Sequence, residues 1–128
     1  MIEAGARKLA EALRSGEYTQ IIGSLRGILT GGADGFCCLG VACEISGLSE
    51  WKPHTSACTY PDSYIGRESD LPARVQVEYE FHSQTGCRRD GRNIEIKGET
   101  YPDLATANDQ GVTFDDIADY IDKYWEEL

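Results

Sequence analysis

The sequence predicts a single small α+β domain over residues 1–128, built around a buried, cysteine-rich central helix. Amphipathic helical patterns occupy both ends of the chain, and short β-branched and aromatic stretches bounded by glycine lie between them. Residues 35–47, GFCCLGVACEISG, form an apolar run with three of the five cysteines. Because 128 residues suit one hydrophobic core, we expect the terminal helices to pack on this run, with a small antiparallel hairpin to one side.

The N-terminal segment is predicted to form a helix followed by short strands. Its apolar residues recur at helical spacing: Ile2, Ala6, Leu9 and Leu13. Gly16 follows as a C-terminal stop signal. The β-branched and aromatic residues of EYTQIIGSLRGILTGGADG, 17–35, predict one or two short strands, and the glycines after Leu29 predict a loop.

The apolar run predicts a buried helix at the centre of the core. Asp34 is the expected N-cap of a helix that begins near Phe36, and Gly47 is the expected stop. Apolar residues fall on both faces of this helix: Phe36, Leu39 and Cys43 on one, and Val41, Ala42 and Ile45 on the other. A helix that is apolar nearly all round is a buried helix. We therefore interpret these cysteines as small apolar core residues.

Residues 48–70 have no regular pattern, and we expect a loop there. The next stretch fits two structures. In RVQVEYEF, apolar and polar residues alternate as in a strand, whereas Leu71, Val75 and Tyr79 fall at helical spacing. The local pattern of residues 72–81 favours the strand, although Pro72 would suit a first helical turn.

The C-terminal third predicts a hairpin followed by a capped amphipathic helix. In CRRDGRNIEIKGETY, 87–101, Asp90-Gly91 is the expected turn and NIEIKG the expected return strand. Thr113 is the expected helix N-cap, with Asp116 completing a capping-box pattern. One apolar stripe then follows: Ile117, Ile121, Tyr124 and Leu128.

The acidic composition limits the classes of partner. The formal net charge is −10, which disfavours duplex nucleic acid, because such binding uses Lys and Arg to neutralise phosphates. An acidic surface suits a basic surface on a partner protein instead. No apolar run approaches the roughly 18 residues of a membrane span, and the N-terminus lacks a signal-peptide pattern. We expect a cytosolic protein with reduced thiols.

Three stretches of the chain are distinctive when taken together: ALRSGEYTQ (12–20), GFCCLGVAC (35–43) and LATANDQGVTFDDIADYI (104–121). Together they resemble a family of small proteins encoded by tailed bacteriophages and prophages. The resemblance implies a phage-derived protein that acts in a bacterial cytoplasm, and it implies no activity. It also implies a short helix after the Leu-Pro, which favours helix over strand for residues 72–81.

The cysteines and histidines do not have the spacing of a zinc site. Seven residues could supply ligand atoms: Cys37, Cys38, Cys43, Cys58, Cys87, His54 and His82. Structural zinc sites pair their ligands about two to four residues apart, whereas the cysteines of the apolar run are adjacent or five apart. We predict no metal and no cofactor.

A small cysteine hydrolase is the competing prediction. Cys37 lies where the central helix is expected to begin, and a helix N-terminus lowers the pKa of a thiol. Cys37 or Cys38 would be the nucleophile, His82 the base, and Asn108 or Asp109 the group that orients the base. Turn formation before the last helix also explains Asn108 and Asp109, because both residue types favour turns.

Two clusters of charge are candidate binding sites. Arg88, Arg89 and Arg92 suit a phosphate group, and three arginines suit a small nucleotide better than a duplex. The aromatic residues that could stack on its base are Tyr60, Tyr64 and Tyr79. The second cluster is acidic and lies on the last helix: Asp115, Asp119 and Asp122.

The functional hypothesis is a non-enzymatic phage or prophage accessory protein that acts in the host cytoplasm. It would bind and neutralise a host component, in particular one of anti-phage defence. Two modes follow from the two clusters: the acidic face covers a basic protein surface, or the arginines sequester a small nucleotide signal. Neither mode involves a membrane, and the sequence leaves homo-oligomer formation open.

Overall fold

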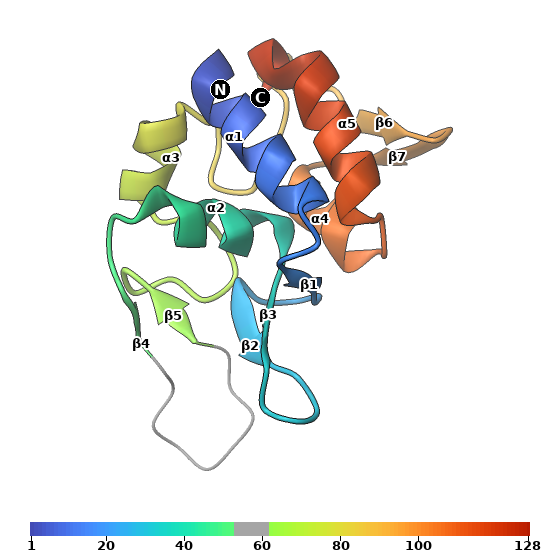
Figure 1. The fold of residues 1–128 in the computed structure, drawn as a ribbon. Coiled ribbons are helices and arrows are strands. Elements are labelled where there is room, and N and C mark those ends of the chain that lie inside the picture. Colours follow the sequence, from blue (N-terminus) through green and yellow to red (C-terminus); the bar gives the residue numbers. More distant parts are fainter. Residues whose placement is uncertain (53–61) are drawn as a thin grey trace.

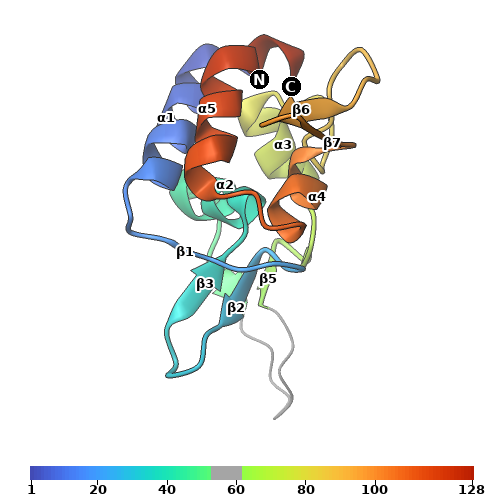
Figure 2. The ribbon, with the colours of Figure 1, turned by 90° about the vertical axis from the view of Figure 1, so that its right-hand side faces the viewer.

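Helices α1, α2 and α5 form the body of the fold. The computed structural model describes residues 1–52 and 62–128 (Figure 1). Helix α1 (Glu3–Arg14) and helix α5 (Phe114–Tyr124) lie side by side and antiparallel, and α2 (Cys38–Ser46) crosses below them (Figures 1 and 2). The combination of helices with small sheets confirms the predicted α+β class.

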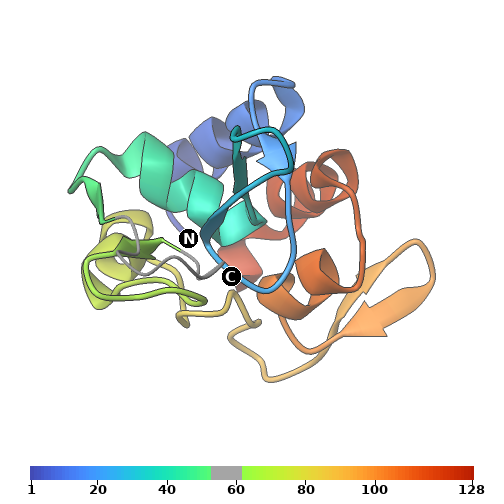
Figure 3. The same ribbon diagram turned by 90° about the horizontal axis from the view of Figure 1, so that it is seen from below.

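The remaining elements are short. In chain order they are β1 (Thr19–Gln20), β2 (Arg26–Ile28), β3 (Asp34–Phe36), β4 (Trp51–Lys52), β5 (Ser63–Tyr64), α3 (Ala73–Tyr79), β6 (Ile94–Ile96), β7 (Glu99–Tyr101), α4 (Leu104–Asp109) and the 3-10 turn η1 (Trp125–Glu127). Strand β3 is central in the sheet β1–β3–β2, parallel to β1 and antiparallel to β2. Hairpin β6–β7 projects beside α5, on the opposite side of the molecule from α3 (Figures 1 and 3).

Helix α1 packs on α2 as predicted, but the main partner of each terminal helix is the other terminal helix. Their facing residues are buried: Ala6, Leu9, Ala10 and Leu13 on α1, and Ile117, Ala118 and Ile121 on α5. Ion pairs join the exposed edges of the two helices. Arg7 Nη1 lies 2.8 Å from Asp122 Oδ1, and Arg14 Nη2 lies 2.7 Å from Asp119 Oδ1.

The buried, cysteine-rich helix α2 is confirmed, but its predicted N-cap is wrong. Asp34 does not cap it, because residues 34–36 pair with β1 and β2 as an extended strand. Helix α2 therefore begins only at Cys38. Cys37 is the N-cap instead, and its Sγ accepts a hydrogen bond from Gly40 N (3.3 Å).

Gly40 allows the first turn of α2 to lie directly against the chain before β2. Cys37 N donates to Leu25 O (3.1 Å), which places that carbonyl beside the helix. A Cβ at Gly40 would lie 1.7 Å from Leu25 O. Because both partners in this contact are backbone within the buried core, a side chain here cannot be accommodated by a rotamer change.

The N-cap of α5 is the predicted residue. Thr113 Oγ1 accepts from Asp116 N (3.3 Å). The Asp116 carboxylate does not complete the expected reciprocal bond; it pairs with Lys97 Nζ of the hairpin (3.0 Å). The hairpin is thereby tied to the first turn of α5.

Residues 73–79 form helix α3, which decides between the two patterns of this stretch. Val75 and Tyr79 are buried in both patterns, but Val77 is 73% exposed, as a helix requires and a half-buried strand does not. The helix ends at Glu80, whose backbone is left-handed (φ 53°).

The predicted hairpin exists, but its turn is at a different place. Strands β6 and β7 pair around Lys97-Gly98, whose φ values of 52° and 80° are those of a type I′ turn. Asp90-Gly91 is therefore not the hairpin turn, and NIEIKG contains the first strand rather than the return strand. The segment before Asp90 cannot be the partner of β6, because Arg89 N donates to Glu127 O (2.8 Å).

The expected loop over residues 48–70 contains a short ribbon. Trp51 of β4 pairs with Tyr64 of β5, and their rings lie 4.8 Å apart. Residues 53–61 lie outside the described part of the chain, and with them His54, Cys58 and Tyr60. Within the described ranges, no helix has both the length and the apolarity to cross a bilayer.

We expect Gly40→Ala to lower the free energy of unfolding by at least about 3 kcal/mol, because the methyl group has no space beside Leu25 O. Urea unfolding followed by circular dichroism measures the change. Gly47→Ala is the control: this residue ends α2 at φ 63° with nothing within 4 Å, so it should cost only about 1–2 kcal/mol of backbone strain. Equal losses would contradict the close-packing argument.

Candidate functional site

The buried amide of Asn108 connects the three stretches that carry the sequence resemblance. Asn108 Oδ1 accepts from Cys38 N at the start of α2 (3.1 Å) and from Gln20 Nε2 of β1 (2.9 Å). Asn108 Nδ2 donates to Ile21 O (2.8 Å). The side chain is fully buried, so these bonds replace water completely.

Gln20 extends this network to α5. Its Nε2 also donates to Val112 O (2.7 Å), and its Oε1 accepts from Phe114 N, a free N–H of the first helical turn (3.1 Å). Asp109 Oδ1 accepts from Gly23 N (2.8 Å). The polar residues of the three stretches therefore hold backbone segments together. Asn108 and Asp109 are the last residues of helix α4, and Gly111 N donates to Asn108 O (3.0 Å), so they also take part in the turn that follows the helix.

The cysteines of α2 are core residues, as the sequence predicted. Cys37, Cys38 and Cys43 are 4%, 1% and 0% exposed. Burial raises the pKa of Cys37 to about 11, although Sγ accepts from backbone N–H groups, which lower it. Burial also raises the pKa of Cys38 well above its ordinary value. Desolvation therefore outweighs the helix N-terminus, and these thiols are protonated at neutral pH.

The hydrogen bonds of His82 are made with residues other than these cysteines. It is exposed, its N donates to Leu128 O, and its own carbonyl accepts from Gln76 Nε2 (3.2 Å). Cys38 instead contacts Asn108 and Leu104. The structure brings Asn108 and Cys38 together, but it does so through a backbone N–H rather than in a catalytic arrangement.

The arginine cluster is largely occupied by groups of the same chain. Arg88 Nε and Nη2 lie 2.9 and 2.6 Å from the Asp90 carboxylate, which this guanidinium holds at a pKa below its usual range. Arg89 Nη2 donates to Glu80 O (3.3 Å), whereas Arg92 is exposed. Tyr64 is 1% exposed.

The second candidate tyrosine of the described residues is also unavailable for stacking. Tyr79 is 3% exposed, and its hydroxyl donates to Ala42 O (3.2 Å) on α2. Tyr60 lies outside the described residues. The structure therefore does not assemble the predicted nucleotide pocket from these side chains.

Acidic residues concentrate in the last quarter of the chain. Residues 94–128 contain ten Asp and Glu against two Lys, a local net charge of −8 out of −10. Of the three predicted acids, Asp119 and Asp122 are paired with the arginines of α1, whereas Asp115 is exposed. Other exposed acids of this segment are Glu95, Glu99, Asp109 and Glu126. This segment, which we call the acidic segment, includes hairpin β6–β7, α4 and α5.

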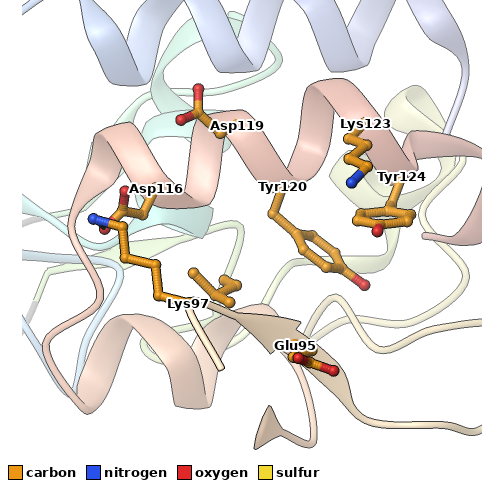
Figure 4. Close-up of a pocket in the computed structure, with 8 residues that line it drawn as sticks. Glu95, Lys97, Asp116, Asp119, Tyr120, Lys123 and Tyr124 are labelled. Carbon is orange, nitrogen blue, oxygen red and sulfur yellow. Dashed lines mark ion pairs between the residues drawn. The ribbon is translucent and has the colours of Figure 1, made fainter. Parts of the chain in front are cut away.

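A groove of about 410 Å³ lies between α5 and the hairpin within the acidic segment. Figure 4 shows Tyr120 and Tyr124 extending from α5 toward the hairpin and Glu95 facing them from β6. The two tyrosine rings lie 4.8 Å apart. The Lys97–Asp116 ion pair closes one end.

The predicted site residues do not include this groove, although the sequence contains one signal for it. Tyr120 and Tyr124 are four residues apart, a spacing that places both rings on one helical face. The predicted apolar stripe includes Tyr124 only as a packing residue. Glu95 and Lys97 line the groove only in the observed strand register, with the turn at Lys97-Gly98. The predicted turn at Asp90-Gly91 implies a different register, so it does not place these two residues beside α5.

Comparison with known proteins yields one match. A family model described as a domain of unknown function (DUF8296) matches residues 3–125. No curated protein and no solved structure matches the chain.

We expect Asn108→Leu to destabilise the fold by about 3 kcal/mol or more, because it leaves Cys38 N, Ile21 O and one Gln20 hydrogen buried without their partner. Asp109→Asn retains an oxygen for Gly23 N and should cost less than about 1 kcal/mol. Thermal unfolding of both variants measures the difference. A native melting temperature for Asn108→Leu would exclude a structural role for the network.

The buried thiols should be inert in the native protein. We expect iodoacetamide at pH 8 to modify Cys87 but to leave Cys37, Cys38 and Cys43 unmodified until the protein unfolds. Because folding raises the pKa of Cys37, its stabilising contribution is complete below pH 9 and decreases as pH rises toward 11. Peptide mass spectrometry measures the modification. Rapid native labelling of Cys37 at pH 7 would restore the hydrolase prediction.

Proposed function

The chain belongs to the DUF8296 family, and we propose that it is a non-enzymatic accessory protein of tailed phages or prophages. It binds a component of host anti-phage defence in the bacterial cytoplasm and neutralises it. The partner presents a basic protein surface, and the acidic segment covers it. The observation that carries this proposal is the concentration of a net charge of −8 in residues 94–128.

The acidic segment has the properties of an electrostatic docking face. Its hairpin lies beside helix α5 (Figure 2), and both elements have exposed acids. Exposed charges add little to fold stability, and repulsion among like charges lowers it. A complementary basic surface would remove this repulsion and accelerate association.

The other two predicted functions receive less support from the geometry. Arg88 is bonded to Asp90 and Tyr120, so a phosphate would have to displace existing partners. Sequestering a nucleotide also requires exposed aromatic rings that can stack on its base, and Tyr64 and Tyr79 are buried. A cysteine hydrolase needs a thiolate open to substrate, whereas Cys37 and Cys38 are buried and protonated.

The proposal predicts that neutralising acids of the acidic segment lowers anti-defence activity. We choose Glu99→Gln, Asp115→Asn and Glu126→Gln together, because these exposed acids form no ion pair within the described residues. Three rim charges at about 0.5 kcal/mol each correspond to about tenfold weaker binding. The measurement is phage plating efficiency on strains that each carry one defence system, with and without the protein.

The matched control is Glu17→Gln, Glu50→Gln and Glu68→Gln, which changes the net charge equally on exposed acids outside the acidic segment. This variant should retain wild-type activity. Arg88→Ala with Arg89→Ala should also retain it. If the arginine variant loses activity while the acidic-segment variant retains it, nucleotide sequestration replaces the present proposal. Equal losses in the two acid variants would show that only total charge matters.

A further inference from the structure

The groove between α5 and the hairpin contains an aromatic face occupied by a cation of the same chain. Lys123 Nζ lies 5.1 Å from the centre of the Tyr124 ring. Tyr124 is half-buried, and Lys123 is exposed with its side chain over the ring (Figure 4). Cations are attracted to the face of a tyrosine ring, so this lysine marks a position where positive charge is favoured.

We propose that this position receives the guanidinium group of an arginine from the basic partner, which displaces Lys123 from the Tyr124 ring. This inference rests on the proposed function and names the contact through which the acidic segment recognises its partner. Arginine fits better than lysine, because its planar group stacks on an aromatic ring while its N–H groups remain free to donate.

Glu95 supplies the second half of the arginine site. It is exposed on β6, faces the two tyrosines across the groove, and forms no ion pair among the described residues (Figure 4). A guanidinium stacked on Tyr124 would have this carboxylate as an acceptor on the facing side of the groove. The Asp116 carboxylate at the other end of the groove is already paired with Lys97.

A guanidinium from within the chain already lies beside this pair of tyrosines. Arg88 Nη1 donates to the Tyr120 hydroxyl (3.4 Å), a contact with the edge of that ring, which leaves the face of the Tyr124 ring to Lys123. In the free protein, Lys123 supplies the positive charge at the Tyr124 ring. An arginine displaces it at little cost in free energy, because the exposed lysine side chain returns to solvent. Removing Lys123 should therefore strengthen arginine binding.

The experiment is a titration of ¹⁵N-labelled protein with acetylated hexa-arginine amide, followed by amide chemical shifts. We expect shifts concentrated in residues 94–97 and 119–125, and no such shifts with hexa-citrulline, which has the same shape without charge. Lys123→Gln should tighten binding about two- to threefold. Lys52→Gln is the matched control, because it makes the same charge change at an exposed position in β4, outside the groove.

Tyr124→Leu and Glu95→Gln should each weaken binding about two- to fivefold, whereas Tyr124→Phe, which keeps the ring face, should bind as the wild type does. Glu50→Gln, at an exposed acid outside the acidic segment, controls for the charge lost at Glu95. Equal effects of Lys123→Gln and Lys52→Gln, or wild-type binding by a folded Tyr124→Leu, would overturn the arginine site. The plating assay would still report on the proposed function, since it uses acids outside this groove.

Discussion

The side-chain amide of Asn108 is the interaction on which the rest of the fold depends. Its four polar contacts connect α4 with β1, with the chain after β1 and with the first N–H of α2. Gln20 then continues the network to the first turn of α5. Helix N-termini and short strand ends have free backbone groups, and burying them without partners costs free energy. One buried amide and one glutamine provide these partners, so the core can close around elements of only two to twelve residues.

This network also explains why polar residues accompany the apolar motif. The cysteines fill space in the core, and Gly40 lets backbone approach backbone. Neither feature positions α2 relative to α4 and α5. Asn108 and Gln20 do so, because hydrogen bonds are directional and hydrophobic contacts are not. The polar residues of these three stretches are therefore explained by their role in this fold, and the proposed functional residues lie elsewhere, on the hairpin and on α5.

The charges of the protein divide into two groups with different consequences. On the α1 side of α5, Asp119 and Asp122 meet Arg14 and Arg7, so these acids support the packing of the terminal helices. On the hairpin side, exposed acids have no such partners among the described residues, and the groove with Tyr120 and Tyr124 lies among them. The same helix thus has acids neutralised by α1 on one side and acids without ion-pair partners among the described residues on the other.

The sequence by itself determined the features that arise from local spacing: the α+β class, the amphipathic helices at both ends, the Thr113 cap and the burial of the cysteines. These depend on the 3.6-residue period and on neighbours within one helical turn. Tertiary structure decided what depends on distant partners. Strand pairing took Asp34 away from α2, the bond from Arg89 to Glu127 moved the hairpin turn to Lys97-Gly98, and burial rather than the helix N-terminus set the pKa of Cys37. The groove belongs to this second group, because Glu95 and Tyr124 are far apart in sequence and meet only when the hairpin packs beside α5.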